Sequence, residues 1–445
     1  MKGNIRYSLV AAAVAAAIAA PAAYATNGYF KIGYGTKNRG MAGAGIAFAQ
    51  DSLAPATNPS GISFIGNRVD FGMELFNPNR DASLDATMIG GADSGKVDSG
   101  ATLFAIPHAG FAFNMGDMTA GLSIVANGGM NTRYNTNVFD TALAPAVPPA
   151  GVPVGAIPNT GTLGVNLSQV LLLPTLAYKL NDNHSVGASL VVGYQRFRAY
   201  GLGDFAAFGF SSDAAHMTNK GDDDAWGAGA RIGWTGKLTD AVTVGATYAS
   251  KVYMQEFDSY KGLFAEQGDF DIPASYGLGI ALKATPAVTI AFDVQRIEYS
   301  DVAAIGNAGP TAAEFLGAFS TPIDSAKLLG ADGGFGFGWQ DVTVYKLGVD
   351  YQYNNQWTFR GGINYGENPI DSNQNLFNIL APGIVEKHVT LGFTYAPTAY
   401  NEVSVTYMHA FREDQSYTYA MGPASYTADI GMDQNAIEVS YAMKF

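Results

Sequence analysis

The sequence predicts an all-β fold: a closed antiparallel transmembrane β-barrel of about fourteen strands, with a small N-terminal segment in its lumen. From residue 68 onward, the chain repeats segments of about ten residues in which apolar and polar side chains alternate, as membrane-spanning β-strands do. The connections between these segments are short and long in turn. The stretch before them, residues 27–61, is rich in glycine and alanine and shows no such alternation.

Composition excludes several other classes of protein. The 445 residues include no cysteine, which excludes a disulfide framework and thiol-based catalysis or metal binding. The formal net charge of -13 argues against nucleic acid as a partner. Beyond the N-terminal segment, no window approaches about 18 uninterrupted apolar residues, so helical membrane spans are not expected.

Residues 1–25 have the organisation of a secretory signal peptide. Lys2 and Arg6 form a positive start, residues 9–20 are apolar, and residues 23–25 form an A-x-A cleavage site. An uncleaved anchor helix is the alternative, but the apolar run is short and a cleavage site follows it. We therefore expect export across the inner membrane.

Residues 26–66 form the predicted segment inside the barrel. A compact, strandless segment ahead of a barrel is either a periplasmic appendage or a plug in the lumen. This segment has neither a run of like charges nor a Pro/Ser-rich linker, and this favours the plug.

Residues 67–445 form the predicted barrel. The expected strands are residues 68–76, 102–114, 118–127, 168–180, 185–197, 225–238, 242–254, 271–284, 288–299, 342–353, 357–365, 385–397, 402–412 and 435–445. Every second connection is a tight turn, and the connections between them are long, as periplasmic turns and extracellular loops are in such barrels. The long ones are residues 77–101, 128–167, 198–224, 255–270, 300–341, 366–384 and 413–434.

Alternation within a strand predicts which face meets lipid. In the last strand, Ile437, Val439 and Tyr441 share one face, opposite Glu438 and Ser440. The apolar face should meet lipid, because a charge there costs about 2–4 kcal/mol at the bilayer midplane. The sheet must close, because unpaired backbone groups in hydrocarbon are costly. A soluble β-sandwich is the alternative.

The N-terminal stretch from residue 40 to 51, followed by Asn58-Pro59-Ser60-Gly61, resembles the hatch of the FadL family. This family comprises outer-membrane transporters for long-chain fatty acids and other hydrophobic compounds. Its hatch carries Asn-Pro-Ala, so Ser60 departs from the pattern. Further similar stretches lie at residues 121–127, 392–396 and 405–409, so the resemblance spans both ends of the chain.

The resemblance implies a fourteen-stranded barrel with an N-terminal hatch, in the outer membrane of a Gram-negative bacterium. It also implies passive passage of the substrate from an external groove to a deeper pocket. An inward kink in the third strand would then release the substrate sideways into the membrane. By motif the kink maps onto Asn127-Gly128-Gly129; the alternative is that these glycines only end the strand.

Two apolar stretches in predicted loops, residues 141–158 and 315–319, are candidate linings of a binding groove, or else pack only on each other. A carboxylate head group would bind a basic side chain that faces the lumen. The candidates from strand alternation are Arg231, Lys251, Lys346 and Arg360. Alternatively, these cations pair with inward-facing acids.

No catalytic or cofactor site is predicted. The five histidines lie in no metal-binding or acyl-transfer motif. Residues 222–224, three consecutive aspartates, either chelate a divalent ion or form a solvated loop. We therefore expect no metal, no cofactor and no enzymatic activity.

The predicted function is passive outer-membrane transport of long-chain fatty acids or other hydrophobic molecules. One alternative is an importer of aromatic or aliphatic hydrocarbons with the same fold, and another is a surface adhesin or structural barrel. An outer-membrane phospholipase is the least favoured. Expected partners are the hydrophobic cargo, outer-membrane lipid with lipopolysaccharide, and the barrel assembly machinery, and we expect a monomer.

Overall fold

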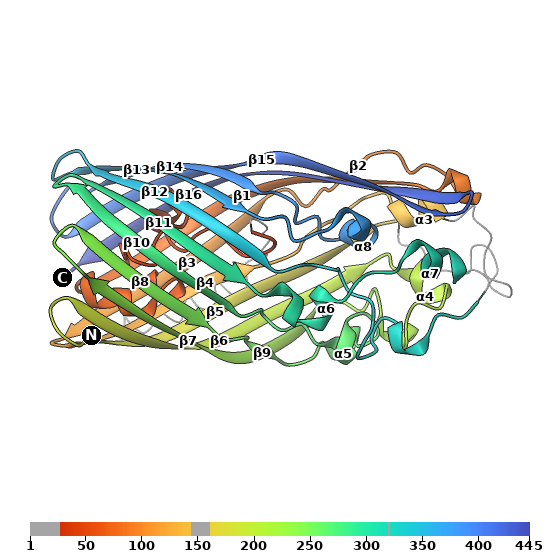
Figure 1. The fold of residues 1–445 in the computed structure, drawn as a ribbon, viewed down its shortest axis with the longest axis horizontal. Helices are drawn as coiled ribbons and strands as arrows, with labels where there is room; N and C mark the ends of the chain where they lie inside the picture. Colours follow the sequence, from red (N-terminus) through yellow and green to blue (C-terminus); the bar gives the residue numbers. More distant parts are fainter. Residues whose placement is uncertain (1–26, 144–160, 319–320) are drawn as a thin grey trace.

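The computed structural model describes residues 27–143, 161–318 and 321–445, so the predicted signal peptide lies outside the described residues. The chain forms one antiparallel sheet in which neighbours in sequence are neighbours in space, and β16 pairs with β1 to close the barrel (Figure 1). Two of the strands, β2 and β9, have two residues each and are side branches of the wall. The other strands make the predicted 14-stranded barrel.

The strands are β1 (Arg68–Asp85), β2 (Val97–Asp98), β3 (Phe104–Met115), β4 (Met118–Gly128), β5 (Gly164–Lys179), β6 (His184–Tyr200), β7 (Asp223–Lys237), β8 (Val242–Ala249), β9 (Tyr253–Met254), β10 (Ser275–Thr285), β11 (Val288–Ile297), β12 (Val342–Gln352), β13 (Trp357–Gly366), β14 (Lys387–Tyr395), β15 (Asn401–Met421) and β16 (Ala424–Lys444).

Short helices occupy the N-terminal segment and the long loops. They are α2 (Thr36–Gly40), η1 (Ala54–Ala56), η2 (Pro59–Phe64), η3 (Thr87–Ile89), α3 (Val138–Leu143), α4 (Gly203–Ala207), η4 (Ala214–His216), η5 (Asp258–Tyr260), α5 (Ala265–Gly268), η6 (Tyr299–Asp301), α6 (Ala303–Gly306), α7 (Ala312–Gly317), η7 (Ser325–Lys327), η8 (Ser372–Gln374) and α8 (Asn375–Asn378). Those after β1 gather at the end of the barrel opposite the C-terminus (Figure 1). Among the described residues, no helix combines the length and apolar character needed to cross a membrane.

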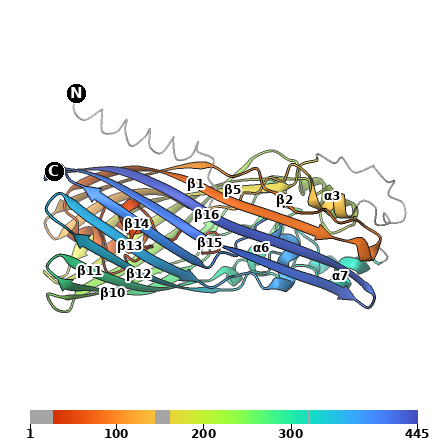
Figure 2. The ribbon, with the colours of Figure 1, turned by 90° about the horizontal axis from the view of Figure 1, so that it is seen from above.

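Two predicted loops are wrong in part. Residues 413–434 are not a loop: β15 and β16 run on to a tight turn between Met421 and Ala424, and β1 extends to Asp85. Together they form a long flap on one side of the barrel (Figure 2). The flap projects beyond the apolar band, and in its β16 part the apolar side chains of Tyr426, Ala428, Ile430 and Met432 face inward and are buried. The predicted strand 242–254 also ends early, because β8 stops at Ala249 and β9 is separate.

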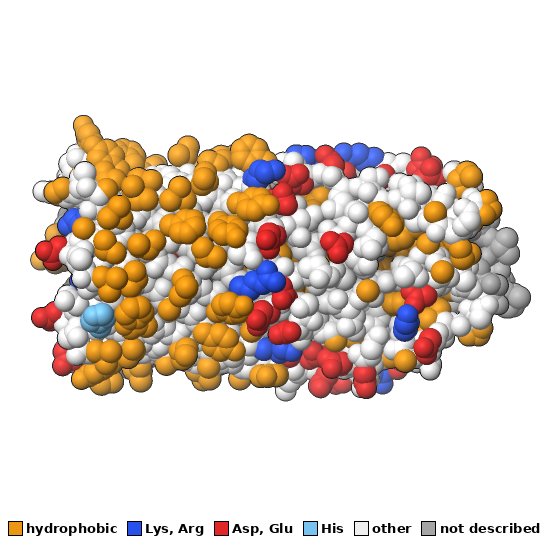
Figure 3. Space-filling view, in the orientation of Figure 1, with side chains coloured by type: hydrophobic (Ala, Val, Ile, Leu, Met, Phe, Trp, Pro, Cys, Tyr) orange, Lys and Arg blue, Asp and Glu red, His pale blue; other side chains and the backbone are white. Residues whose placement is uncertain are grey.

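The outer surface carries the expected apolar band. Ile437, Val439 and Tyr441 are 51%, 45% and 42% exposed, whereas Glu438 between them is fully buried. Figure 3 shows hydrophobic side chains over the half of the molecule nearest the C-terminus, with charged side chains gathered where the band ends. This is the pattern of a wall with lipid outside and polar contacts within.

Residues 27–66 lie among the inward faces of strands from opposite sides of the barrel. Helix α2 lies against β13 to β16, and η2 lies against β4 to β7. The fit to the wall depends on glycine: a Cβ on Gly348 of β12 would lie 2.6 Å from the Met41 Cβ, and one on Gly187 of β6 would lie 2.5 Å from the Ser60 nitrogen.

Candidate functional site

Ion pairs join the N-terminal segment to the strands where the barrel closes. The Lys31 Nζ lies 2.5 Å from Glu74 Oε2, and the Arg39 Nη2 lies 2.7 Å from Glu74 Oε1. The Thr36 hydroxyl donates to Glu438 Oε1 at 2.9 Å. Glu74 is on β1 and Glu438 on β16, so the segment bridges the two strands that close the sheet. All five side chains are almost fully buried.

The predicted hatch motif contacts the opposite wall. The Asn58 amide nitrogen donates to the Trp234 carbonyl at 3.1 Å, and the Asn58 Oδ1 accepts from the Ser60 nitrogen at 3.2 Å. The Ser60 hydroxyl lies 2.7 Å from the Thr235 hydroxyl on β7. Pro59 follows the N-cap Asn58 and begins η2. Serine at this position therefore adds a hydrogen bond to the wall that alanine cannot make.

Gly61 completes the motif in a tight internal contact. A Cβ on Gly61 would lie 2.6 Å from the Ala49 Cβ. The motif and the stretch from residue 40 to 51 are thus packed together.

Strand β4 separates from β3 near its end. Its pairing with β3 stops at Ile124, opposite Ala109, although β3 itself begins at Phe104. Pairing with β5 continues to Gly128, with a register shift after Ala126. Every residue from 123 to 128 is buried, where a lipid-facing strand would expose alternate residues. The end of β4, where the kink was predicted, therefore has no ladder partner on β3 and is buried on both faces.

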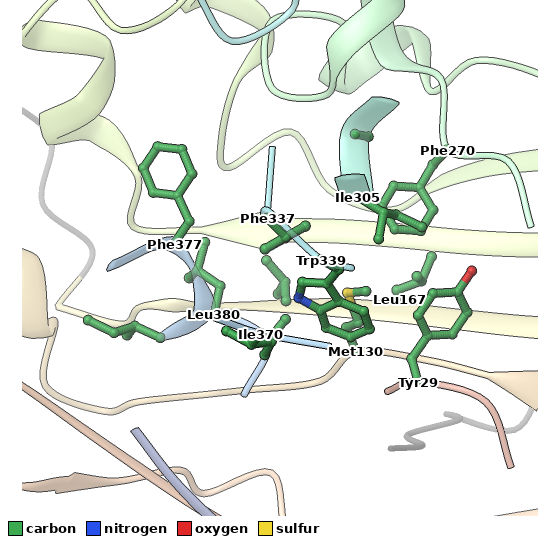
Figure 4. Packing of buried hydrophobic residues seen from close by; sticks show 14 of the residues in the cluster. Tyr29, Met130, Leu167, Phe270, Ile305, Phe337, Trp339, Ile370, Phe377 and Leu380 are labelled. Atoms are coloured by element: carbon green, nitrogen blue, oxygen red, sulfur yellow. The ribbon is translucent and has the colours of Figure 1, made fainter. Parts of the chain in front are cut away.

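The N-terminal segment covers this part of β4. Phe30 forms an isolated β-bridge with Gly128. A Cβ on Gly128 would lie 2.6 Å from the Tyr29 ring, so the close approach requires glycine. The Tyr29 ring centroid lies 5.4 Å from that of Tyr299 and 6.0 Å from that of Trp339. Figure 4 shows Tyr29 beside Trp339 and Met130, at one end of a packed apolar row that leads to Phe377 and Leu380.

A chain of side-chain hydrogen bonds fixes Asn127. The Tyr34 hydroxyl donates to Asn127 Oδ1 at 2.9 Å, and the Asn127 amide donates to Gln169 Oε1 at 3.0 Å. The Gln169 amide donates to Gln195 Oε1 at 3.1 Å, and the Gln195 amide donates to the Phe270 carbonyl at 3.0 Å. Asn127, Gln169 and Gln195 are buried, so the connected bonds hold the end of β4 in one arrangement.

An apolar chamber of about 40 Å³ lies among the long loops. It is lined by Val165, Phe197, Leu202, Phe205, Met217, Leu263, Phe264, Ala304, Leu329, Phe335, Gly336, Phe337, Phe377 and Leu380. Six of these are phenylalanine and none is charged. A cavity needs about 10–15 Å³ of volume open to a water-sized sphere to hold one water molecule. The chamber is therefore narrow in this structure.

Of the two apolar stretches predicted to line a groove, residues 144–158 lie outside the described residues. In the second stretch, Phe315 on α7 is fully buried, with its ring centroid 4.9 Å from that of Tyr426 on β16. Leu316 is also buried. These side chains are packed beneath the flap and are not an open lining.

Two of the four predicted carboxylate-binding cations are already engaged. The Arg360 Nε lies 2.8 Å from Asp350 Oδ2 and donates to Gln50 Oε1 at 2.7 Å. Lys251 lies beyond β8, is partly exposed and donates to the Asp301 carbonyl at 2.6 Å. Arg360 is therefore neutralised by an inward-facing acid.

The other two predicted cations, Arg231 and Lys346, have no ion pair within 4.0 Å in the described part of the chain. The Arg231 Nη1 donates to the Thr57 carbonyl at 3.2 Å, and its Nε has no partner there. The Lys346 Nζ donates to Gln295 Oε1 at 2.8 Å. Both side chains are buried, so each remains a candidate.

Sequence reasoning missed Arg80, which lies on β1 in a region predicted to be a loop. Arg80 is 4% exposed and donates from Nη2 to the Ala101 carbonyl. The signal was present in the alternation, because Asp70, Glu74 and Arg80 share the inward parity of one continuous strand.

Two of the three consecutive aspartates pair with arginines. The Asp222 Oδ1 lies 2.7 Å from Arg198 Nε, and the Asp224 Oδ1 lies 2.6 Å from Arg196 Nε. Within the ranges that the structure describes, no three acidic or histidine side chains converge as metal ligands.

The closed barrel and its apolar outer band define an outer-membrane β-barrel protein of the kind found in Gram-negative bacteria. A family-wide sequence profile described as "Outer membrane protein transport protein (OMPP1/FadL/TodX)" matches residues 159–445. The chain belongs to this family, as the N-terminal and C-terminal motifs indicated.

Individual relatives agree with the family. The long-chain fatty acid transport protein of Escherichia coli K12 is 25% identical over 453 residues, which cover 94% of each chain. The crystal structure of the P. putida toluene transporter TodX aligns with a TM-score of 0.63 and 19% identity, covering 93% of this chain and 99% of that one. A Pseudomonas aeruginosa FadL homologue gives a TM-score of 0.66 and 16% identity, covering 94% and 100%. These structures share the fold, and the relatives are described as transport proteins rather than enzymes.

Proposed function

We propose that this protein carries hydrophobic molecules, above all long-chain fatty acids, passively across the outer membrane and releases them sideways through its wall. The observation that carries the proposal is the interrupted pairing of β3 with β4, next to an apolar interior. The ladder stops at Ile124 while both strands continue, so backbone hydrogen bonds do not seal the wall there.

A sideways exit suits oily cargo. Each methylene exposed to water costs about 0.8 kcal/mol, so a long acyl chain is held back by a water-filled pore. The phenylalanine-lined chamber, and the apolar row from Phe377 to Tyr29, keep such a chain out of water up to the end of β4. The narrow chamber must widen around cargo, which its loop-borne walls permit.

The N-terminal segment is the proposed hatch of this route. Residues 1–25 are removed as a signal peptide, residues 26–66 act as the plug, and residues 67–445 form the barrel. Asn58-Pro59-Ser60-Gly61 anchors the plug to β7, and Asn127-Gly128-Gly129 forms the kink. Because Phe30 bridges Gly128, the first residues of the plug must shift for cargo to reach the gap. The barrel works as a monomer, inserted by the assembly machinery beside lipopolysaccharide, and performs no catalysis.

A hydrocarbon importer of the same fold is the second candidate. Its support is the chamber lining, which is rich in phenylalanine and without charge. The family also includes a structure described as a toluene transporter. A neutral aromatic cargo would need no cation along its path.

Uptake of labelled oleate and of labelled toluene, by cells that lack other importers, tests both candidates. Oleate uptake that depends on this protein supports the first proposal, and dependence of toluene uptake alone supports the second. If neither depends on it, the transport proposal fails.

A further inference from the structure

Arg80 is a buried cation without a counter-ion. No carboxylate of the described residues lies within 4.0 Å of its guanidinium, and its Nε has no hydrogen-bond partner there. Among the residues that the structure describes, its side chain has one hydrogen bond, to the Ala101 carbonyl. A buried charge is costly unless it is paired, so an unpaired guanidinium calls for an explanation.

Two other buried arginines of the barrel interior are neutralised, whereas Arg231 has no ion pair within 4.0 Å among the described residues either. Arg39 pairs with Glu74, and Arg68 pairs with Asp70 at 2.7 Å. The shortage of carboxylates at Arg80 is therefore local, in a chain that carries 38 acidic residues against 25 basic ones.

Arg80 lines a small cavity beside the end of β4. The cavity has a volume of about 10 Å³, and its wall includes Tyr29, Gly129, Met130, Trp339 and Met432. Most of this wall is apolar, and Gly129 and Met130 directly follow β4. The cation thus faces the point where the proposed route turns out of the barrel.

We propose that Arg80 binds the carboxylate of an acyl-chain acid while its tail lies in the apolar row ending at Tyr29. This rests on the proposed transport route and selects acids over neutral hydrocarbons. The free Nε and the Nη groups present a planar fork that matches a carboxylate, and such charge-assisted bonds are the strong kind. The cavity holds about one water at present, so the head group enters as Tyr29 or Trp339 moves aside.

Equilibrium binding of oleate and of oleyl alcohol to the purified full-length protein in detergent tests this assignment. Arg80→Met keeps the bulk and removes the charge, so oleate should bind about 10- to 100-fold more weakly while oleyl alcohol binds as before. Arg80→Lys keeps the charge but lacks the planar fork of the guanidinium, so its affinity for oleate should lie between those of the unaltered protein and Arg80→Met. Arg133→Met removes an exposed arginine close in sequence to Met130 of the cavity wall and should leave both affinities unchanged.

Three results would overturn the assignment. Equal weakening of both ligands would show that Arg80 only supports the structure. If Arg231→Met loses its preference for oleate over oleyl alcohol while Arg80→Met keeps it, the carboxylate binds the other unpaired arginine, Arg231. If the unaltered protein binds neither ligand, the proposed function fails as well, and heat-modifiable migration of each variant separates these results from misfolding.

Discussion

Cross-linking β3 to β4 beyond their last paired residues should block transport if cargo leaves between them. Pairing ends at Ala109 and Ile124. Had the ladder continued in the same register, Pro107 would lie opposite Ala126. The sequence has no cysteine, so two introduced cysteines can form only the intended link.

The structure sets the distances that the experiment depends on. Residues directly opposite in an antiparallel ladder have Cα atoms about 4.5–5.5 Å apart, within the range that a disulfide spans. Ala109→Cys with Ile124→Cys should therefore oxidise directly. Pro107→Cys with Ala126→Cys lies past the end of pairing, so a direct disulfide should not form. A cleavable linker that reacts with two thiols and spans about 10 Å, twice the spacing of paired strands, should join the two cysteines.

Uptake of labelled oleate is the assay. The linker at Pro107→Cys and Ala126→Cys should reduce uptake to the level of cells without the protein, and cleavage of the linker should restore it. The control disulfide at Ala109→Cys and Ile124→Cys should leave uptake unchanged, because it ties strands that already pair. Full uptake with the linker in place would refute the sideways exit. Rapid formation of a direct disulfide in Pro107→Cys with Ala126→Cys would show that β3 and β4 lie close together there, and so would refute the gap between them.

Three further outcomes are expected. Gly128→Val with Gly129→Val should slow uptake, because side chains there would overlap neighbouring atoms, while heat-modifiable migration stays intact; unchanged uptake would remove the kink from the route. Ser60→Ala should lower the free energy of unfolding by about 1–2 kcal/mol and keep uptake, since it loses buried hydrogen bonds; denaturant titration measures this, and equal stability would contradict it. Burial and the neighbouring Asp271 carboxylate raise the pKa of Asp269 to about 7. Between about pH 4 and 7 the unfolded chain has lost this proton and the folded loop keeps it, so stability should fall as pH rises. Thermal unfolding of Asp269→Asn should lack this slope, and a retained slope would assign it elsewhere.

The strands were predictable because lipid imposes a simple rule on them. Within the apolar band each strand shows one lipid-facing parity, and the last strand displays it without a break from Ile437 to Met443. The flap was missed because residues 424–434 stand clear of the band, so no rule about lipid applies to them. There the apolar side chains, from Tyr426 to Met432, face inward toward the loops with α7 and α8, whereas Ile437 and Val439 face outward, so the parity of the alternation reverses within the strand.

In the candidate site, the sequence alone does not show which inward-facing cations are neutralised. Parity alone places Arg360, Arg231 and Arg80 on the inward face but cannot tell which of them is neutralised. That depends on strand register: Asp350 lies directly opposite Arg360, whereas Arg80 lies opposite Met432. Ladder partners cannot supply a carboxylate at Arg231 either, because Ser189 and Ala249 flank it. Once register is known, the unpaired arginines follow from the sequence, since an inward arginine keeps its charge available only where neither neighbouring strand offers an acid. Lys346 differs, because Asp293 lies opposite it but accepts from the Gly45 and Ile46 nitrogens instead.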